Sequence, residues 1–153
     1  MAWLKFSFVT SDDPISTSIR AETWCDYSHV DYVLDNGERI GAHEQDGVQQ
    51  RPADYAVWTA RLDVMVPCTD AQKEAAEAFL RAQIGTPYDK AAIAGILVHR
   101  DWRTEGEWFC SELGMAACEA CGVVAPVPIN IDRITPRDLL LVLSAMAKQQ
   151  EAA

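Results

Sequence analysis

Residues 29–44 read HVDYVLDNGERIGAHE, and this stretch predicts a β-hairpin. Apolar side chains recur through residues 29–34 and 38–42, and the triplet Asp35-Asn36-Gly37 separates the two runs. An Asn followed by Gly favours the tight turn that matches the twist of paired strands. We therefore expect two antiparallel strands joined at Asn36-Gly37.

The rest of the chain divides into a β-rich first half and a helical second half. Alternating apolar and polar residues predict strands at residues 3–9 and 61–66. Thr69 and Gln72 form a capping box for a helix that should end at Gly85. Further helices are predicted at residues 90–98, at residues 110–121 and from Thr135-Pro136 onward. The order of elements predicts an α+β fold in which an antiparallel sheet packs against helices.

Length and charge narrow the function classes. The 153 residues suit one domain over residues 1–153, and 49% hydrophobic residues are enough for a buried core. The net charge of −10 argues against nucleic acid as a partner, because phosphate backbones attract basic surfaces. No stretch has the roughly 18 apolar residues of a membrane span, and the first residues lack the apolar core of a signal peptide. We expect a cytoplasmic protein without integral membrane association. Its release from the cell would require lysis or another secretion route.

Cys110 is the most informative of five cysteines, an odd number that favours reduced thiols. The helical pattern begins at Cys110, where unpaired N–H groups and the helix dipole favour the thiolate over the thiol. A nucleophilic cysteine needs a base, and His29, at the head of a predicted strand, is the best candidate among His29, His43 and His99. Cys110 and His29 are equally compatible with plain packing roles.

Two groups of residues resemble the NlpC-type cysteine peptidases. The stretches Ile84-Gly85-Thr86-Pro87-Tyr88-Asp89 and Phe109-Cys110-Ser111-Glu112-Leu113 look like that family's nucleophile segment. His29-Val30, with the hairpin and Ile40-Gly41-Ala42, resembles its catalytic-histidine hairpin. Because His29 precedes Cys110 and Cys-Ser-Glu replaces Cys-Ser-Gly, the chain resembles the circularly permuted branch. The resemblance covers roughly residues 24–45 and 71–122.

The resemblance implies a papain-like fold and acyl transfer through a thioester. Cys110 would be the nucleophile, and His29 would be the base that then protonates the leaving group. We expect Tyr88, Ser111 and Glu112 to contact the substrate. That substrate would be a small peptide, a cell-wall peptide or a lipid-derived amide or ester, with no cofactor or metal, in a bacterial or prophage protein. The oligomeric state and the choice between hydrolysis and transfer stay open.

A third residue should orient His29 from the next strand, but direct alignment places Gly41 there. A two-residue turn would put Glu44 opposite His29, and a three-residue loop would put His43 there. We favour Glu44, since a carboxylate can stabilise the imidazolium, while a Cys-His dyad oriented by the backbone or by water stays open.

Two other readings remain. Gly41 would suit an inactive papain-fold module that binds a partner or serves as structure. A zinc protein using Cys118 and Cys121, with Cys25 and His29, is the weaker reading, because a single Cys-x-x-Cys is present and buried packing explains it.

Overall fold

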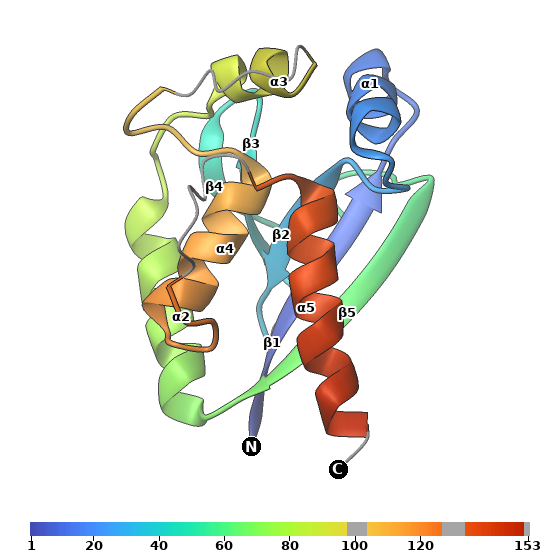
Figure 1. Ribbon diagram of the computed structural model, residues 1–153. Coiled ribbons are helices and arrows are strands. Elements are labelled where there is room, and N and C mark those ends of the chain that lie inside the picture. The colour runs from blue at the N-terminus through green and yellow to red at the C-terminus, as the bar shows by residue number, and fades with distance from the viewer. Residues whose placement is uncertain (98–103, 127–133, 152–153) are drawn as a thin grey trace.

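The computed structural model describes residues 1–97, 104–126 and 134–151, with the backbone alone for residues 148–151. A five-stranded antiparallel sheet runs through the described chain in the order β4-β3-β2-β1-β5 (Figure 1). The strands are β1 (Ala2–Thr10), β2 (His29–Val33), β3 (Arg39–His43), β4 (Gly47–Arg51) and β5 (Ala60–Cys68). The sheet therefore comes entirely from the first half of the chain, as the sequence predicts.

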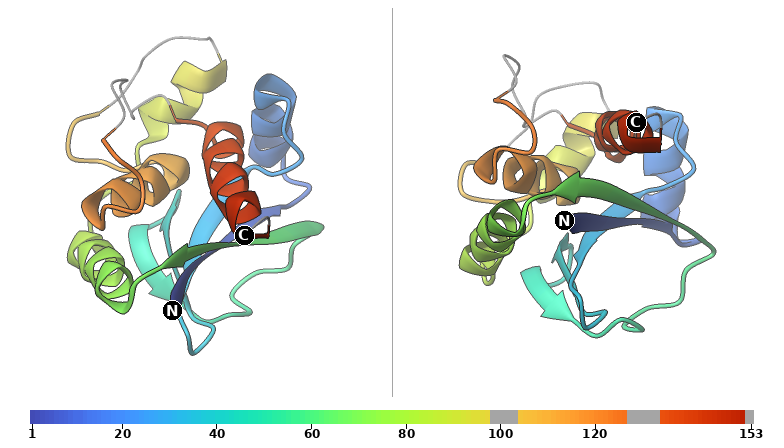
Figure 2. Two further views of the ribbon diagram at one scale, coloured as in Figure 1. Left: turned by 60° about the horizontal axis from the view of Figure 1, so that its bottom comes forward. Right: turned by 90° about the horizontal axis from the view of Figure 1, so that it is seen from below.

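Five helices accompany the sheet in the described ranges. They are α1 (Pro14–Thr23), α2 (Asp70–Gln83), α3 (Lys90–Leu97), α4 (Cys110–Ala120) and α5 (Pro136–Glu151). Helix α4 packs on β2 and β3, α5 packs on β5, and α2 packs beside α4. Helices α1 and α3 lie together at the end of the molecule opposite the two termini (Figures 1 and 2). The molecule is an α+β structure with its helices gathered on one side of a curved sheet.

Local sequence signals explain where the helices begin. Thr69 caps α2: its hydroxyl accepts from the Gln72 N–H at 3.1 Å, and the Gln72 side chain accepts from the Thr69 N–H at 3.0 Å. Thr135 and Asp138 exchange equivalent hydrogen bonds at the start of α5. The predicted helix starts at these positions are confirmed, and the predicted end of α3 at Val98 lies outside the described residues.

The β2–β3 hairpin has a three-residue loop. Leu34 and Glu38 close it, with the Leu34 N–H donating to the Glu38 carbonyl at 2.8 Å, and Gly37 takes the left-handed conformation at φ 86°. Tyr32 consequently pairs with Ile40, and Val33 pairs with Arg39. The two-residue turn that favoured Glu44 is wrong, because Gly37 ends a longer loop instead of forming the second half of a two-residue turn.

The core fills the space between the sheet and the helices. Its sheet side includes Leu4, Phe6, Phe8 and Tyr32, and its helix side includes Leu113, Leu139 and Leu143, all at most 2% exposed. Gly114 brings α4 close to α5, since a Cβ there would lie 2.7 Å from Leu139 Cδ2. This close packing fixes the position of α4 over β2 and β3.

No helix among the described residues is both long enough and apolar enough to span a bilayer.

Candidate functional site

Cys110 is the first residue of α4 and is almost fully buried. The preceding residue, Phe109, is extended, and its N–H donates to the Glu112 carboxylate at 3.3 Å. Trp108 pairs with the 87–89 segment through hydrogen bonds to the Pro87 carbonyl and from the Asp89 N–H, each at 3.0 Å. The Cys110 sulfur is therefore held where the first N–H groups of a helix have no partner within the helix.

His29, the first residue of β2, meets Cys110. Its imidazole lies close enough to the Cys110 side chain for Cys110 to contribute to the raised pKa of His29. His29 pairs with Val9 in the neighbouring β1, and β2 lies under α4. The structure thus brings together the two residues that the sequence proposes as nucleophile and base.

Asp31 completes the arrangement, and no local pattern in the sequence predicts this role. Its side chain is fully buried, and its Oδ1 accepts from His29 Nε2 at 2.7 Å. Its other oxygen accepts from the Tyr55 hydroxyl at 2.8 Å and lies 3.6 Å from Arg39 Nη1. Because alternate residues of a strand project to the same side, His29 and Asp31 are neighbours along one strand.

Gly41 explains how Asp31 fits. A Cβ at Gly41 would lie 2.0 Å from Asp31 Oδ1, so any larger residue would occupy the space of the carboxylate. The next strand therefore supplies room for the orienting group, and β2 supplies the group itself. The absence of a side chain at Gly41 is a requirement of the site.

Neither Glu44 nor His43 orients His29, and both predictions are corrected. Glu44 is exposed in the turn after β3. The His43 ring lies 5.1 Å from the His29 ring, but its Nε2 is 3.8 Å from Asp31 Oδ1, which is beyond hydrogen-bonding distance. Asp31 takes their place because it reaches Nε2 from within the same strand. His99 lies outside the described residues.

The Asp31 carboxylate sets the charge states of both histidines. Burial opposes a charged His29, but the charge and hydrogen bond of Asp31, aided by Cys110, raise the pKa of His29 to about 10. Although burial opposes its charge too, His29 lowers the pKa of Asp31 to about 2. Burial and the nearby charge of His29 lower the pKa of His43 to about 4. At neutral pH the site holds an imidazolium at His29, beside Cys110, and a neutral His43.

Two aromatic residues from the β4–β5 connection cover this pair. The Trp58 ring stacks on His29 with centroids 6.2 Å apart and an interplanar angle of 17°. The Tyr55 ring, whose hydroxyl binds Asp31, lies roughly perpendicular to the Trp58 ring, and the two ring centroids are 5.4 Å apart. These rings shield the His29–Asp31 hydrogen bond from water. The sequence gives no local signal for either role, because the contacts link a loop to a strand more than twenty residues away.

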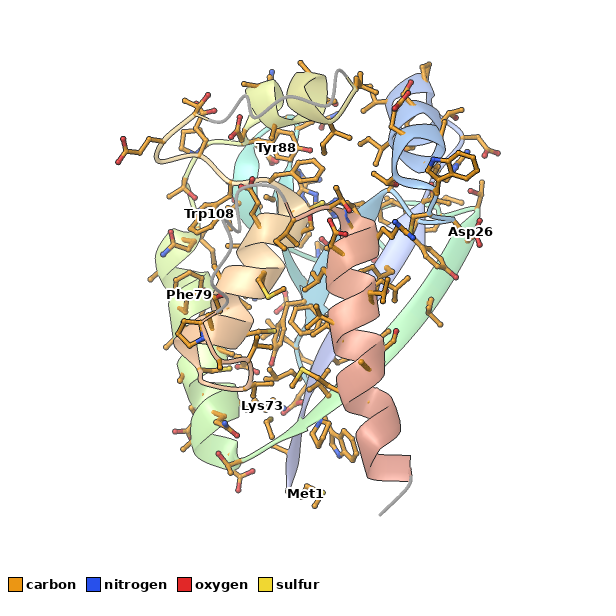
Figure 3. The ribbon with its side chains drawn as sticks, viewed as in Figure 1. Met1, Asp26, Lys73, Phe79, Tyr88 and Trp108 are labelled. Carbon is orange, nitrogen blue, oxygen red and sulfur yellow. The ribbon has the colours of Figure 1, made fainter. Side chains whose placement is uncertain are left out.

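The three predicted substrate contacts lie in different surroundings. Tyr88 is half-buried beside the start of α4, with its ring 5.9 Å from that of Phe109 (Figure 3). Burial, together with Cys110 and Glu44, raises the pKa of Tyr88. Ser111 is fully buried and donates to the Ile134 carbonyl at 2.5 Å, and the buried Glu112 bonds the Phe109 N–H. Ser111 and Glu112 hold α4 in place and are corrected from substrate contacts to structural ones.

The cysteine-based zinc reading finds no support in the described residues. Cys118 and Cys121 belong to the hydrophobic core, and burial raises the pKa of both thiols. The His, Cys, Asp and Glu ligand atoms that do converge in the described ranges are those of His29, Asp31 and His43, which lie within 4.8 Å of one another.

Comparisons with known proteins identify a fold and no function. The sequence matches no protein-family model, and no curated protein matches it. The structure is similar to that of metalloprotein yiiX from Escherichia coli O157:H7, a DUF1105 protein, with a TM-score of 0.60 and 20% sequence identity. The match covers 78% of this chain but only 66% of that one, just under two thirds of its length. At this identity the likeness shows a shared fold alone.

The Gly41–Asp31 contact predicts a stability change that depends on its partner. Gly41→Ala should lower the free energy of unfolding by about 1–3 kcal/mol, because the new Cβ displaces a pinned carboxylate. In the Asp31→Ala/Arg39→Met background, which removes both buried charges, the same change should cost less than about 0.5 kcal/mol. Urea unfolding of the four proteins measures both values. Equal costs in the two backgrounds would show that the carboxylate is not what Gly41 accommodates.

Proposed function

We propose that the protein is a cysteine hydrolase or acyltransferase that forms a thioester on Cys110. One observation carries the proposal: Cys110, at a helix N-terminus, lies beside His29, whose Nε2 donates to the buried Asp31 carboxylate. Covalent acyl transfer uses a nucleophile, a base beside it and a carboxylate that orients the base, and the three residues are arranged in this order.

The chemistry follows from the charge states of the site. The Cys110 thiolate attacks the acyl carbonyl carbon, and the carbonyl oxygen becomes an oxyanion. The backbone N–H of Cys110, which has no partner within α4, is suited to receive it. When the intermediate collapses, the bond to the leaving nitrogen or oxygen breaks, and the His29 imidazolium gives that atom its proton. A thioester and a neutral His29 remain.

The second half regenerates the enzyme. Water, or an acceptor amine or alcohol, attacks the thioester carbonyl and gives a proton to His29. The carbon–sulfur bond then breaks and returns the Cys110 thiolate beside the imidazolium. Asp31 keeps the Nε2 proton throughout, so that Nδ1 is the nitrogen that exchanges protons at the Cys110 side.

The permuted NlpC-type, papain-like family is our proposed home for this fold. Its support is the order of the parts: a histidine hairpin, then a cysteine at the start of a helix packed on that hairpin. The inactive-module reading loses its motive, because Gly41 makes room for Asp31. We propose an amide or ester acyl group as the substrate, with peptides and lipid-derived compounds as its two sources.

Thiol labelling tests the proposed nucleophile. At pH 6 iodoacetamide should modify Cys110 at least about tenfold faster than Cys25, the most exposed of the other thiols, because thiolate reacts and thiol does not. His29→Ala should remove this advantage. Mass spectrometry of tryptic peptides gives the rate at each cysteine, and Cys118 serves as the buried control. Equal slow labelling of Cys110 and Cys25 in the unmodified protein would refute the proposal.

Substitutions at Asp31 test its positioning role. Asp31→Asn keeps an oxygen for His29 but removes the charge, so Cys110 labelling should fall by about threefold. Asp31→Ala should reduce it to the level of His29→Ala. Asp63→Asn, which alters an ion-paired carboxylate on β5, is the matched control and should leave labelling unchanged. Partial rescue by Asn relative to Ala, with near-UV circular dichroism retained, separates positioning from general loss of structure.

A further inference from the structure

A second chemistry is available where β2 and β3 meet. One ring nitrogen of His29, one carboxylate oxygen of Asp31 and one ring nitrogen of His43 lie within 4.8 Å of one another, so three potential metal-ligand atoms converge. Acyl transfer as proposed above uses His29 and Asp31 and gives His43 no role. Any role of His43 therefore depends on the groups that surround its ring nitrogen.

His43 Nε2 is an unpartnered buried atom in the described part of the chain. The His43 side chain is only 10% exposed, and Nε2 points toward Asp31 Oδ1 at 3.8 Å without bonding it. A buried polar atom without a partner destabilises the fold, because it has lost its hydrogen bonds to water and gained none in return. This cost has an explanation if His43 Nε2 binds a ligand in a second, ligand-bound state of the protein.

We infer that His29, Asp31 and His43 form a binding site for a divalent transition-metal ion, with Zn²⁺ the best fit. Two imidazoles and one carboxylate are donors that zinc accepts readily, whereas Mg²⁺ and Ca²⁺ prefer oxygen alone. Water would complete the coordination. The site goes beyond the proposed acyl transfer and does not depend on it.

The spacing of the donors suits such an ion after small movements. Ligands about 2.0–2.1 Å from a tetrahedral Zn²⁺ lie roughly 3.3 Å apart. The observed separations from Asp31 Oδ1 fall on either side of this value, at 2.7 Å to His29 Nε2 and 3.8 Å to His43 Nε2. Movements of about half an ångström by the His29 and His43 side chains would bring both separations to this value.

Neighbouring groups fix the orientation of the Asp31 carboxylate. Its outer oxygen, Oδ2, is bound by the Tyr55 hydroxyl at 2.8 Å and lies near Arg39, which leaves Oδ1 directed at the histidines. Partners of this kind orient metal ligands in many sites. The ion would take the place of the His29 Nε2 proton, which leaves to solvent, so the metal-bound state has a different group orienting the catalytic imidazole.

Metal titration of the purified full-length chain tests the site directly. Isothermal titration with ZnCl₂ should give one ion per chain, and Co²⁺ should give visible absorption bands without the thiolate charge-transfer band that cysteine ligands produce. His43→Ala and His43→Gln should each weaken Zn²⁺ binding by at least about tenfold. Cys110→Ala should bind Zn²⁺ as the unmodified protein does.

The controls separate this site from the others. Absence of Zn²⁺ binding, or binding that survives both His43 variants, would overturn the inference. Binding lost in Cys118→Ser/Cys121→Ser but kept in His43→Gln would overturn it too, since the ion would then sit on cysteines. Rapid labelling of Cys110 in His43→Gln reports on the acyl-transfer proposal alone, so either proposal can fail while the other stands.

Discussion

The buried carboxylate of Asp31 is the constraint on which the site depends. A carboxylate removed from water is costly unless charges and hydrogen-bond donors surround it. Here the surrounding groups are the His29 imidazolium, the Tyr55 hydroxyl and the buried Arg39. Each of them comes from a different part of the sheet or from the β4–β5 connection, so a single charge ties these segments together. The same charge determines that His29 stays protonated beside Cys110.

Register gives this carboxylate its place. The loop at residues 35–37 pairs Tyr32 with Ile40, and the continued register sets Gly41 opposite Asp31. One residue fewer in the loop would put a side chain of β3 against the carboxylate and turn His43 away from His29. The length of one hairpin loop thus decides both the orienting residue and the neighbouring histidine. Helix α4, held close to α5 by Gly114, then sets Cys110 against the end of β2.

These dependencies explain which parts of the structure were predictable. Strong local signals, such as the Thr69 capping box and the start of α4 at Cys110, predict their elements correctly. The sequence does not predict α1, because its Ser- and Thr-rich stretch has little helical preference beyond the Asp13 cap and Pro14, and it does not predict β4, because GVQQR is short and polar. Asp31 escapes prediction for another reason. The resemblance places the orienting residue across the hairpin, whereas Asp31 lies two positions from His29 on the same strand and fills the space at Gly41.

Burial and charge repulsion from His29 keep His43 neutral. Two imidazolium rings with centroids 5.1 Å apart, sharing one buried carboxylate, would carry more positive charge than Asp31 can balance, especially with Arg39 nearby. His29 keeps the proton because it bonds Asp31 directly and lies beside Cys110. His43 therefore remains neutral, with its Nε2 3.8 Å from the same oxygen. One carboxylate oxygen thus faces a proton donor on one side and the ring nitrogen of a neutral imidazole on the other. Acyl transfer needs the first of these groups, and an incoming cation would need both.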